Sequence, residues 1–237
     1  MNLALIGYGK MGKAIEKLAI DNGHKISLIA DSYAELKALY QDALAIDVAI
    51  EFSTPEAAFE NIKFCLQNNI PVLSGTTGWL EKLVEIEEIT ISTNGTFFYA
   101  SNFSLGVNLF FKLNKQLATL LSNSNYVPKI KEVHHIHKKD APSGTAITLA
   151  EDIIKKNSKL SGWVNSKTSN VGKIPILSAR ENSVPGTHII TYQSENDEIT
   201  IEHKAYNRKG FASGAMAIAK WLINKKGVLT MDDFLDG

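Results

Sequence analysis

The sequence predicts an α/β protein in which a Rossmann-like parallel-sheet domain is followed by an α+β domain with an open mixed or antiparallel sheet. Three observations support this fold class. Short apolar strands alternate with helical patterns over residues 1–104, and a glycine-rich turn follows the first strand. Beyond residue 104 the strands become longer, and few helices separate them. We therefore expect a domain junction near residue 104.

The first strand and its turn predict a nucleotide-binding unit. An apolar run at residues 3–6 leads into GYGKMG, residues 7–12, and then into an apolar helical pattern. Gly7, Gly9 and Gly12 match GxGxxG, in which one glycine makes a tight turn, one lets the backbone approach a pyrophosphate, and one lets helix pack on strand. A flavodoxin-like or other nucleotide turn is the alternative.

The later strands of the first domain are followed by polar turns. Strands are expected near residues 26–30, 47–52, 71–74, 89–92 and 97–99, with a helix near 56–68. The strand at 26–30 ends at Asp31, whose carboxylate can bind the ribose hydroxyls of a dinucleotide. The polar turns at 53–55 and 75–78 should face the same crevice as the glycine turn, because ligands bind at the carboxyl ends of parallel strands. Plain helix capping is the alternative for each turn.

The second domain is expected to be built around an open sheet. A helix is predicted at residues 107–121, longer strands at 126–138, 174–179, 184–193 and 198–205, and a last helix at 210–224. This pattern favours a mostly antiparallel sheet, whose broad face is suited to binding another subunit. The stretch 160–172, rich in Ser, Asn and Gly, predicts a mobile loop.

The segment EVHHIHKKDAPSGTA, residues 132–146, combines basic side chains with the start of a helix. The basic residues are His134, His135, His137, Lys138 and Lys139. Ser143, Gly144 and Thr145 open an apolar helical run, where free N–H groups and the helix dipole favour an anion, the dipole alone by roughly 0.3–1 kcal/mol. The combination predicts a site for a small acidic ligand.

Two other interpretations of this segment remain open. In one, the histidines are ordinary strand residues and Ser143 is a plain helix cap. In the other, His135 and His137 share a strand face and bind a metal ion, but the adjacent lysines oppose a cation, so we predict no metal site. Strict strand alternation sends His134 and His135 to opposite faces, so the strand must end or twist here.

Composition excludes several classes of function. The 237-residue chain has 25 basic and 25 acidic residues, so its net charge attracts neither nucleic acid nor an anionic membrane. No apolar run approaches the ~18 residues of a membrane-spanning helix, and a strand at residue 2 leaves no room for a signal peptide. Cys65, the only cysteine, is expected in the core and fits a reducing compartment. We expect a cytoplasmic protein.

These segments together resemble the 4-hydroxy-tetrahydrodipicolinate reductase family, also called dihydrodipicolinate reductases. The resemblance covers nearly the whole chain, through GYGKMG, EFSTPEA (51–57), GTTG (75–78), ASNFSLGVN (100–108), EVHHIHKKDAPSGTA and YNRKGFASGA (206–215). The histidine-rich signature is highly specific, whereas the glycine turn is not. The resemblance implies a homotetrameric enzyme of the diaminopimelate route to lysine, which reduces a cyclic dicarboxylate with a nicotinamide cofactor.

The resemblance also implies domains and residue roles. Residues 1–104 with 209–237 would form the dinucleotide-binding domain, and residues 105–208 the substrate-binding and oligomerisation domain. His134 would donate a proton with help from Lys138. The substrate-binding residues implied are His135, Lys138, Ser143, Gly144 and Thr145. The cofactor-binding residues implied are Gly7, Tyr8, Gly9, Lys10, Met11, Gly12, Asp31, Gly75, Thr76, Thr77, Ala100, Ser101, Asn102 and Phe103.

Cofactor preference follows from the residues after Asp31. Some family members place Arg directly after the acidic residue, where it can meet the 2′-phosphate of NADPH, but here Ser32 and Tyr33 follow. A carboxylate without an adjacent Arg repels that phosphate, so we predict that NADH is preferred and NADPH possible, with Lys37 softening the preference. The short connection between Asp31 and Asp47 departs from the family pattern and predicts a more open adenosine side.

Two functions of other classes fit the same residues. One is another NAD(P)-linked dehydrogenase, acting on an amino-acid semialdehyde or hydroxy acid, and the other is a non-catalytic dinucleotide sensor. A sensor needs no proton donor, whereas the reductase does. Changing His134 and Lys138 therefore separates the reductase from the sensor, whereas the other dehydrogenase is expected to act on open-chain carbonyl substrates.

Overall fold

The computed structural model describes residues 1–41, 45–166, 171–207 and 209–237. The chain forms two compact units, one made of Met1–Leu105 with Lys209–Gly237 and the other of residues 106–208. None of the helices in the described ranges combines the length and the apolar character that a membrane crossing requires.

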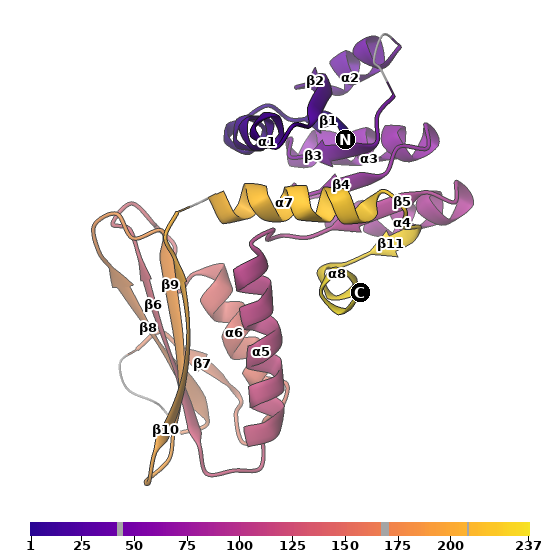
Figure 1. Ribbon diagram of the computed structural model, residues 1–237. Coiled ribbons are helices and arrows are strands. Elements are labelled where there is room, and N and C mark those ends of the chain that lie inside the picture. The colour runs from indigo at the N-terminus through magenta and orange to yellow at the C-terminus, as the bar shows by residue number, and fades with distance from the viewer. Residues whose placement is uncertain (42–44, 167–170, 208) are drawn as a thin grey trace. The chain divides into compact units, whose positions relative to one another are not determined.

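The first unit is a parallel sheet of six strands with helices on both faces, in the strand order β11-β5-β4-β3-β1-β2 (Figure 1). The strands are β1 (Asn2–Ile6), β2 (Lys25–Ala30), β3 (Val48–Glu51), β4 (Val72–Ser74), β5 (Thr96–Tyr99) and β11 (Gly227–Leu229). The helices are α1 (Lys10–Asp21), α2 (Tyr33–Tyr40), α3 (Pro55–Gln67), α4 (Leu83–Ser92), α7 (Lys209–Leu222) and α8 (Met231–Asp236), with the 3-10 turn η1 (Leu80–Lys82) before α4. This arrangement confirms the predicted Rossmann-like fold.

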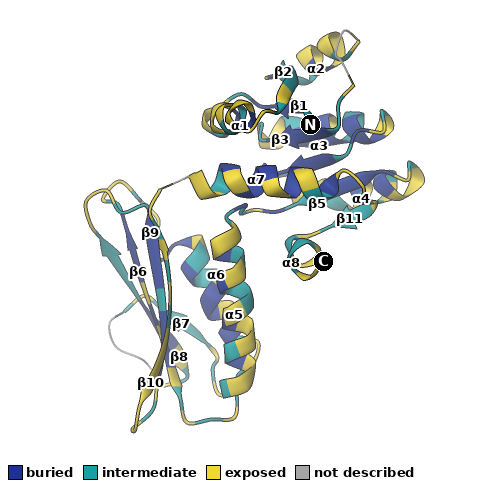
Figure 2. Cartoon of the chain, viewed as in Figure 1, coloured by how far each residue is buried: buried dark blue, intermediate teal, exposed yellow. Residues whose placement is uncertain are grey.

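Alternating side chains of β1 contribute to two apolar layers. Leu3 and Leu5 pack into a cluster with residues of α1 and α7, whereas Ala4 and Ile6 pack into a cluster with residues of α3, among them the buried Cys65. Figure 2 shows the sheet as a buried layer beneath helices whose outer faces are exposed. Covering both faces requires the continuously apolar sequence from which β1 was predicted.

Helix α7 packs directly on the backbone of the first unit. A Cβ built at Gly214 would lie 1.7 Å from the carbonyl oxygen of Phe103, so only glycine fits there. The buried residues Ala215 and Leu222 of the same helix join the cluster of Leu3 and Leu5. Helix α7, near the end of the chain, therefore completes the apolar cluster to which β1, at its start, contributes.

One predicted strand of the first unit is wrong. Residues 89–92, of which three are β-branched, predict a strand, but they form the last turn of α4. Ile86 and Thr90, four residues apart, are both fully buried, and the Thr90 hydroxyl donates to the Ile86 carbonyl at 2.7 Å. Packing of this helical face against the α3 layer overrides the local β propensity.

The second unit is an open, mixed sheet with the strand order β10-β9-β6-β8-β7. Its strands are β6 (Val127–His134), β7 (Gly162–Val164), β8 (Lys173–Arg180), β9 (Gly186–Gln193) and β10 (Glu198–Ala205), and its helices are α5 (Leu105–Leu121) and α6 (Gly144–Ile154). Strand β9 runs antiparallel to β6 and β10, whereas β8 runs parallel to β6 and β7. This confirms the predicted open mixed or antiparallel sheet, and its parallel part arises because α6 makes a crossover after β6.

Two other boundaries differ from the prediction. The strand expected at 126–138 ends at His134, and a turn follows in which the Lys138 N–H donates to the His135 carbonyl at 3.1 Å. The stretch 160–172 contains β7 rather than only a loop, and its residues 167–170 lie outside the described residues. Residues 42–44, in the short connection after Asp31, also lie outside them.

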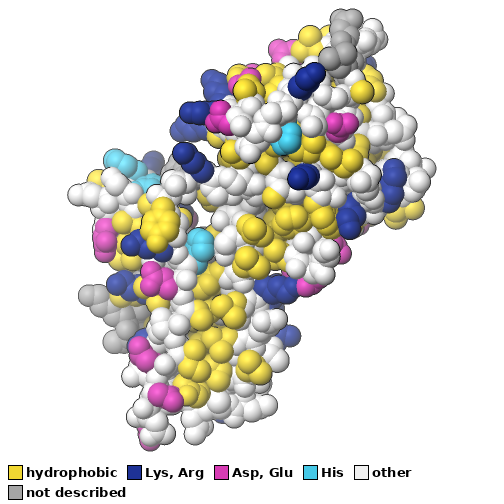
Figure 3. Space-filling view, in the orientation of Figure 1, with side chains coloured by type: hydrophobic (Ala, Val, Ile, Leu, Met, Phe, Trp, Pro, Cys, Tyr) yellow, Lys and Arg dark blue, Asp and Glu magenta, His cyan; other side chains and the backbone are white. Residues whose placement is uncertain are grey.

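Helix α5 is apolar on its outer side as well as its inner side. Phe110 and Ala118 are buried in the cluster that α5, α6 and the sheet form. Leu109, Leu113 and Leu120 are exposed instead, and Figure 3 shows apolar side chains gathered over this helix. The apolar pattern thus predicted the helix without indicating its buried face.

Candidate active site

The turn between β1 and α1 has the geometry that its glycine spacing predicts. Gly7 has a φ of +91°, and a Cβ there would lie 2.1 Å from the Phe52 carbonyl oxygen. A Cβ at Gly12 would lie 2.4 Å from the Gly7 carbonyl oxygen, whereas a Cβ at Gly9 would meet nothing within 4 Å. Gly7 and Gly12 are therefore needed for close packing, and Gly9 leaves open space before the free N–H groups of α1.

That space belongs to a cleft of about 280 Å³ at the carboxyl ends of β1, β3 and β4. Its lining residues are Gly9, Lys10, Met11, Phe52, Ser53, Pro55, Gly75, Thr76 and Thr77. A helix N-terminus beside bare backbone suits a phosphate, so the cleft fits the diphosphate of a dinucleotide. The lining confirms that the polar turn at 53–55 faces the glycine turn, although sequence reasoning gave Phe52, Ser53 and Pro55 no individual binding role.

Asp31 lies at the end of β2, beside the glycine turn. Its carboxylate accepts the N–H of Tyr8, and Ser32 caps α2 by accepting the N–H of Glu35 at 3.2 Å. The ammonium of Lys37 lies 5.7 Å from the centre of the Tyr33 ring. An exposed carboxylate at this strand end has the position expected of a ribose-binding group.

Residues 100–103 make mainly structural contacts. Ala100 and Phe103 are buried, and the Phe103 ring packs against the Phe52 ring with centres 5.3 Å apart. Asn102 accepts the N–H of Ser104 at 2.8 Å, which shapes the turn, and Ser101 is exposed. Their predicted contact with a cofactor stays a prediction.

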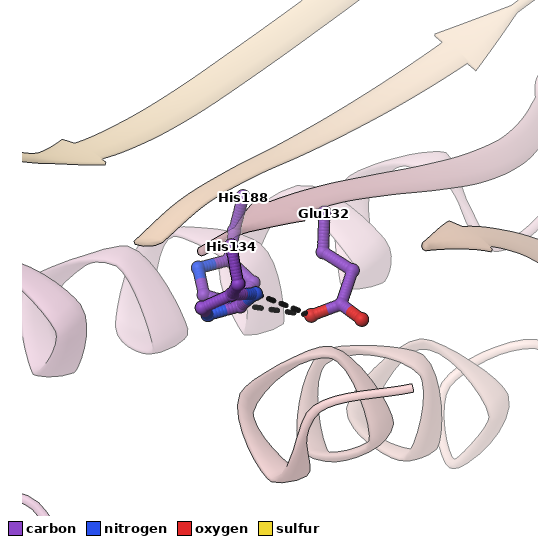
Figure 4. Close-up of side chains that lie close together, drawn as sticks. All are labelled: Glu132, His134 and His188. Atoms are coloured by element: carbon purple, nitrogen blue, oxygen red, sulfur yellow. Dashed lines mark ion pairs between the residues drawn. The ribbon is translucent and has the colours of Figure 1, made fainter. Parts of the chain in front are cut away.

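A buried cluster of charged groups surrounds Glu132 near the end of β6. Oε2 of Glu132 lies 2.9 Å from Nδ1 of His134 and 4.0 Å from Nε2 of His188, and Figure 4 shows both rings directed at the carboxylate. Oε1 accepts hydrogen bonds from two guanidinium nitrogens of Arg180, each at 3.4 Å. Strand register produces this meeting, because Glu132 pairs with His188 on β9 and His134 with Arg180 on β8.

The start of α6 packs against the same carboxylate. The Ser143 N–H donates to Oε1 of Glu132 at 3.1 Å, and Ser143 Oγ lies 3.2 Å from Nε2 of His188. Ser143 Oγ also caps α6 by accepting the N–H of Ala146 at 3.2 Å. Gly144 is exposed, and a Cβ there would meet nothing within 4 Å. The predicted anion-binding helix start and His134 are therefore joined through Glu132.

The other basic side chains converge less than the sequence suggests. Lys138 donates to both carboxylate oxygens of Asp140, at 2.9 and 2.8 Å. His137 and Lys139 are exposed, and the rings of His135 and His137 lie 6.2 Å apart. The structure thus brings His134 and Ser143 together around Glu132 and leaves His137 and Lys139 on the surface.

The buried groups of the cluster have shifted pKa values. Burial alone would raise the pKa of Glu132, but contacts with His134, Ser143 and Ser178 hold it well below its usual range. Burial, reinforced by the charge of His134, lowers the pKa of His188 to about 4. At neutral pH Glu132 is therefore ionised and His188 neutral.

Sequence reasoning did not identify Glu132, Arg180 or His188 as site residues. Glu132 lies two residues before His134 on the same face of β6, so its spacing was an available signal, whereas only strand pairing brings Arg180 and His188 to the cluster. Glu132, His134 and His188 offer donor atoms within 4.8 Å of one another, a set that can ligate a divalent metal. Arg180 already neutralises this carboxylate, however, and a metal ion would have to compete with its guanidinium. We interpret the cluster as an acid–base arrangement.

Comparison with known proteins connects both units to one family. Residues 1–103 match the family model described as the N-terminus of dihydrodipicolinate reductase, and residues 106–235 match the model of its C-terminus. A 4-hydroxy-tetrahydrodipicolinate reductase from Christiangramia forsetii is 49% identical over 236 residues, which cover 99% of this chain and 98% of the relative. A reductase of the same name from Archaeoglobus fulgidus is 33% identical, with 100% of both chains covered.

A solved structure agrees with these matches. It is described as a dipicolinate-bound dihydrodipicolinate reductase from Paenisporosarcina sp. TG-14. The two chains are 26% identical, and the similarity covers 99% of each with a TM-score of 0.82.

Proposed function

The chain belongs to the dihydrodipicolinate reductase family, and on this premise we propose that it reduces 4-hydroxy-tetrahydrodipicolinate to tetrahydrodipicolinate with NADH or NADPH. This reaction is a step of the diaminopimelate route to lysine. The observation that carries the proposal is the ionised, buried Glu132 between His134 and the start of α6. In this arrangement a proton donor, His134, lies beside a binding site for a carboxylate, the start of α6.

We assign the cofactor to the first unit. When bound, the nicotinamide supplies a hydride ion. The backbone at Gly9 and the first turn of α1 hold the diphosphate, and Asp31 binds the adenosine ribose. The cofactor assignment also includes the remaining residues of 7–12, residues 75–77 and residues 100–103. The open backbone at Gly9 supports this assignment.

We further propose that NADH is preferred over NADPH. Asp31 carries a negative charge where the 2′-phosphate of NADPH would lie, and Ser32 and Tyr33 add no positive charge. Lys37, whose ammonium lies over the Tyr33 ring, softens the preference. NADPH is therefore a possible but poorer cofactor.

The substrate is assigned to the second unit, which offers two sites for its two carboxylates. One carboxylate binds the free N–H groups at Gly144 and Thr145 with the Ser143 hydroxyl. The other binds His135 and Lys138, and Lys138 exchanges its partner Asp140 for the substrate. The dipicolinate bound to the Paenisporosarcina reductase is a ring with the same pair of acidic groups, which supports this assignment.

His134 supplies the proton that the reaction requires besides the hydride. Glu132 engages Nδ1 of His134, so Nε2 is the nitrogen that delivers the proton. A Cβ at Gly186 would lie 3.1 Å from Nε2, so the bare backbone there leaves room for the ring. Contacts with His134 and Ser143 keep Glu132 ionised, and that charge stabilises a positively charged His134 ring before transfer. Lys138 assists by its positive charge.

We also propose that the protein is a cytoplasmic homotetramer. Side chains alternate along β6, β8 and β9, and those facing away from α5 and α6 line a hollow of about 820 Å³. They include Val127, Lys129, Leu177, Ile189 and Thr191. This mixed face suits contact with other subunits, and the buried free thiol of Cys65 suits a reducing compartment.

A coupled assay tests the activity. The upstream synthase, pyruvate and aspartate semialdehyde generate the unstable substrate, and the purified protein is added with NADH or NADPH. We expect absorbance at the nicotinamide band to fall only when all components are present. Turnover of open-chain semialdehydes or hydroxy acids, with none of the cyclic substrate, would overturn the proposal.

A further inference from the structure

A second carboxylate, that of Glu51, is fully buried under the cleft of the first unit. Glu51 is the last residue of β3, and it is 0% exposed. Its oxygens accept the Ser53 N–H at 2.9 Å, the Thr76 hydroxyl at 2.9 Å, the Ser74 hydroxyl at 2.6 Å and the Ser53 hydroxyl. Within the described part of the chain, Glu51 forms no ion pair, so only neutral groups satisfy it.

The groups around Glu51 are arranged as hydrogen-bond donors to its carboxyl oxygens. Thr76 Oγ1 already accepts the Ser53 N–H at 2.9 Å, and Ser53 Oγ accepts an N–H of Asn61 at 3.2 Å. Each of these hydroxyls therefore uses its own proton to donate to Glu51. Oε1 of Glu51 therefore only accepts hydrogen bonds, and Oε2 has the Ser74 hydroxyl as its partner. This set of donors suits a carboxylate, and no cation accompanies it among the described residues.

Glu51 lies on the side of the cleft where the nicotinamide half of the cofactor is expected. Ser53 and Thr76 line the cleft together with the start of α1. The sheet order is β2-β1-β3-β4, with Asp31 at the end of β2 and the diphosphate site after β1. A dinucleotide that crosses this edge with its adenosine ribose at Asp31 brings its nicotinamide half to the β3 and β4 turns.

We propose that Glu51 is a positioning residue that acts through Ser53 and Thr76, and that its fixed charge favours the oxidised cofactor. This inference rests on the cofactor assignment above. The nicotinamide ring is positively charged in NAD⁺ and neutral in NADH, so a buried anion on its side of the cleft stabilises NAD⁺ relative to NADH. The same charge therefore assists release of the hydride.

Binding measurements on the full-length Glu51→Gln variant test the proposal without relying on turnover. The dissociation constant of NADH is measured by fluorescence and that of NAD⁺ by calorimetry. We expect the ratio Kd(NAD⁺)/Kd(NADH) to rise about three- to tenfold, as expected for a unit charge acting across a partly solvated cleft. A merely structural role would weaken both cofactors by a common factor, and an unchanged ratio would overturn the proposal.

Two further variants separate charge from shape. Glu51→Asp retains the charge, so its ratio should stay near that of the unmodified protein even if both affinities fall. Glu51→Ser is a second neutral variant that leaves room for water, and it replaces Glu51→Gln if thermal melting shows the latter unfolded. If the unmodified protein binds neither cofactor, the assigned function fails; if it binds both and neutral variants keep the ratio, only this inference fails.

Discussion

Glu51 and Glu132 are two fully buried carboxylates with opposite surroundings. Hydroxyl and backbone donors satisfy Glu51 in the first unit, whereas Arg180 and His134 meet Glu132 in the second. Neutral donors leave a net negative charge, which acts on a neighbour through its field. The cationic partners of Glu132 cancel its negative charge, and one of them, His134, carries a proton that can be transferred. The same side chain thus supports an electrostatic task in one unit and an acid–base task in the other.

The largest effect should follow from removing the proton donors of the second unit. We expect His134→Gln with Lys138→Ala to lower kcat by about 10² to 10⁴-fold, with the Kd for NADH changed less than about twofold. The matched control is His137→Gln with Lys139→Ala, which changes the exposed neighbours in the same segment. Steady-state kinetics and fluorescence binding measure the two effects. Full turnover in the first variant would remove His134 from the mechanism.

The second prediction compares the two carboxylates directly by stability. Glu132→Gln leaves a guanidinium and an imidazole without their partner, which should cost about 3–5 kcal/mol of unfolding free energy. Glu51→Gln disturbs only neutral donors and should cost about 1–3 kcal/mol. Urea unfolding measures both, with Glu202→Gln on the exposed side of β10 as a control within about 0.5 kcal/mol. Equal losses of unfolding free energy in the two variants would contradict the proposed difference between the surroundings of Glu132 and Glu51.

The third prediction is a pH dependence that belongs to the second unit. The unfolded chain protonates His188 below about pH 6.5, but the folded chain does so only below about pH 4. Between these values the unfolded state binds more protons, so stability falls as the pH falls. We expect the unfolding free energy at pH 5 to be about 1–2 kcal/mol lower than at pH 7. The depressed pKa of Glu132 adds a further loss at lower pH.

His188→Gln isolates the histidine contribution to this pH dependence. Glutamine does not titrate, so most of the change between pH 7 and pH 5 should disappear. If the variant keeps the full change, another group is responsible.

The smallest effect should concern the exposed carboxylate Asp31. We expect kcat/KM to favour NADH over NADPH by about tenfold or less, because a surface charge is screened by solvent. Ser32→Arg should move the ratio towards NADPH, and Ser32→Gln is the matched control, since both variants lose the cap of α2 but only one adds charge. A strong preference of the unmodified protein for NADPH would contradict the role given to Asp31.

Local patterns predicted the first unit better than the second. The glycine spacing reflects local geometry, because Gly7 and Gly12 lie against backbone in the turn or at the neighbouring strand, and Gly9 faces open space. The cluster at Glu132 depends instead on the pairing of β6 with β8 and β9, which no local pattern contains. His134 and Ser143 were found through a family signature, while Arg180 and His188 carried no such signal.

The wrong strand at residues 89–92 has the same explanation. Its β-branched residues favour a strand when considered alone, but Ile86 and Thr90 are buried at helical spacing against the α3 layer. A long-range contact therefore decided a local structure. Strand β7 was missed likewise, because it lies in a stretch rich in Ser, Asn and Gly.

The return of α7 to the first unit has a consequence for protein synthesis. The ribosome makes residues 1–105 first, yet the helix whose Gly214 abuts Phe103 emerges only after residues 106–208. Until then the nascent chain exposes the apolar surface of Leu3 and Leu5 that α7 later covers. The unit that is contiguous in sequence can fold first, and the nucleotide unit matures last.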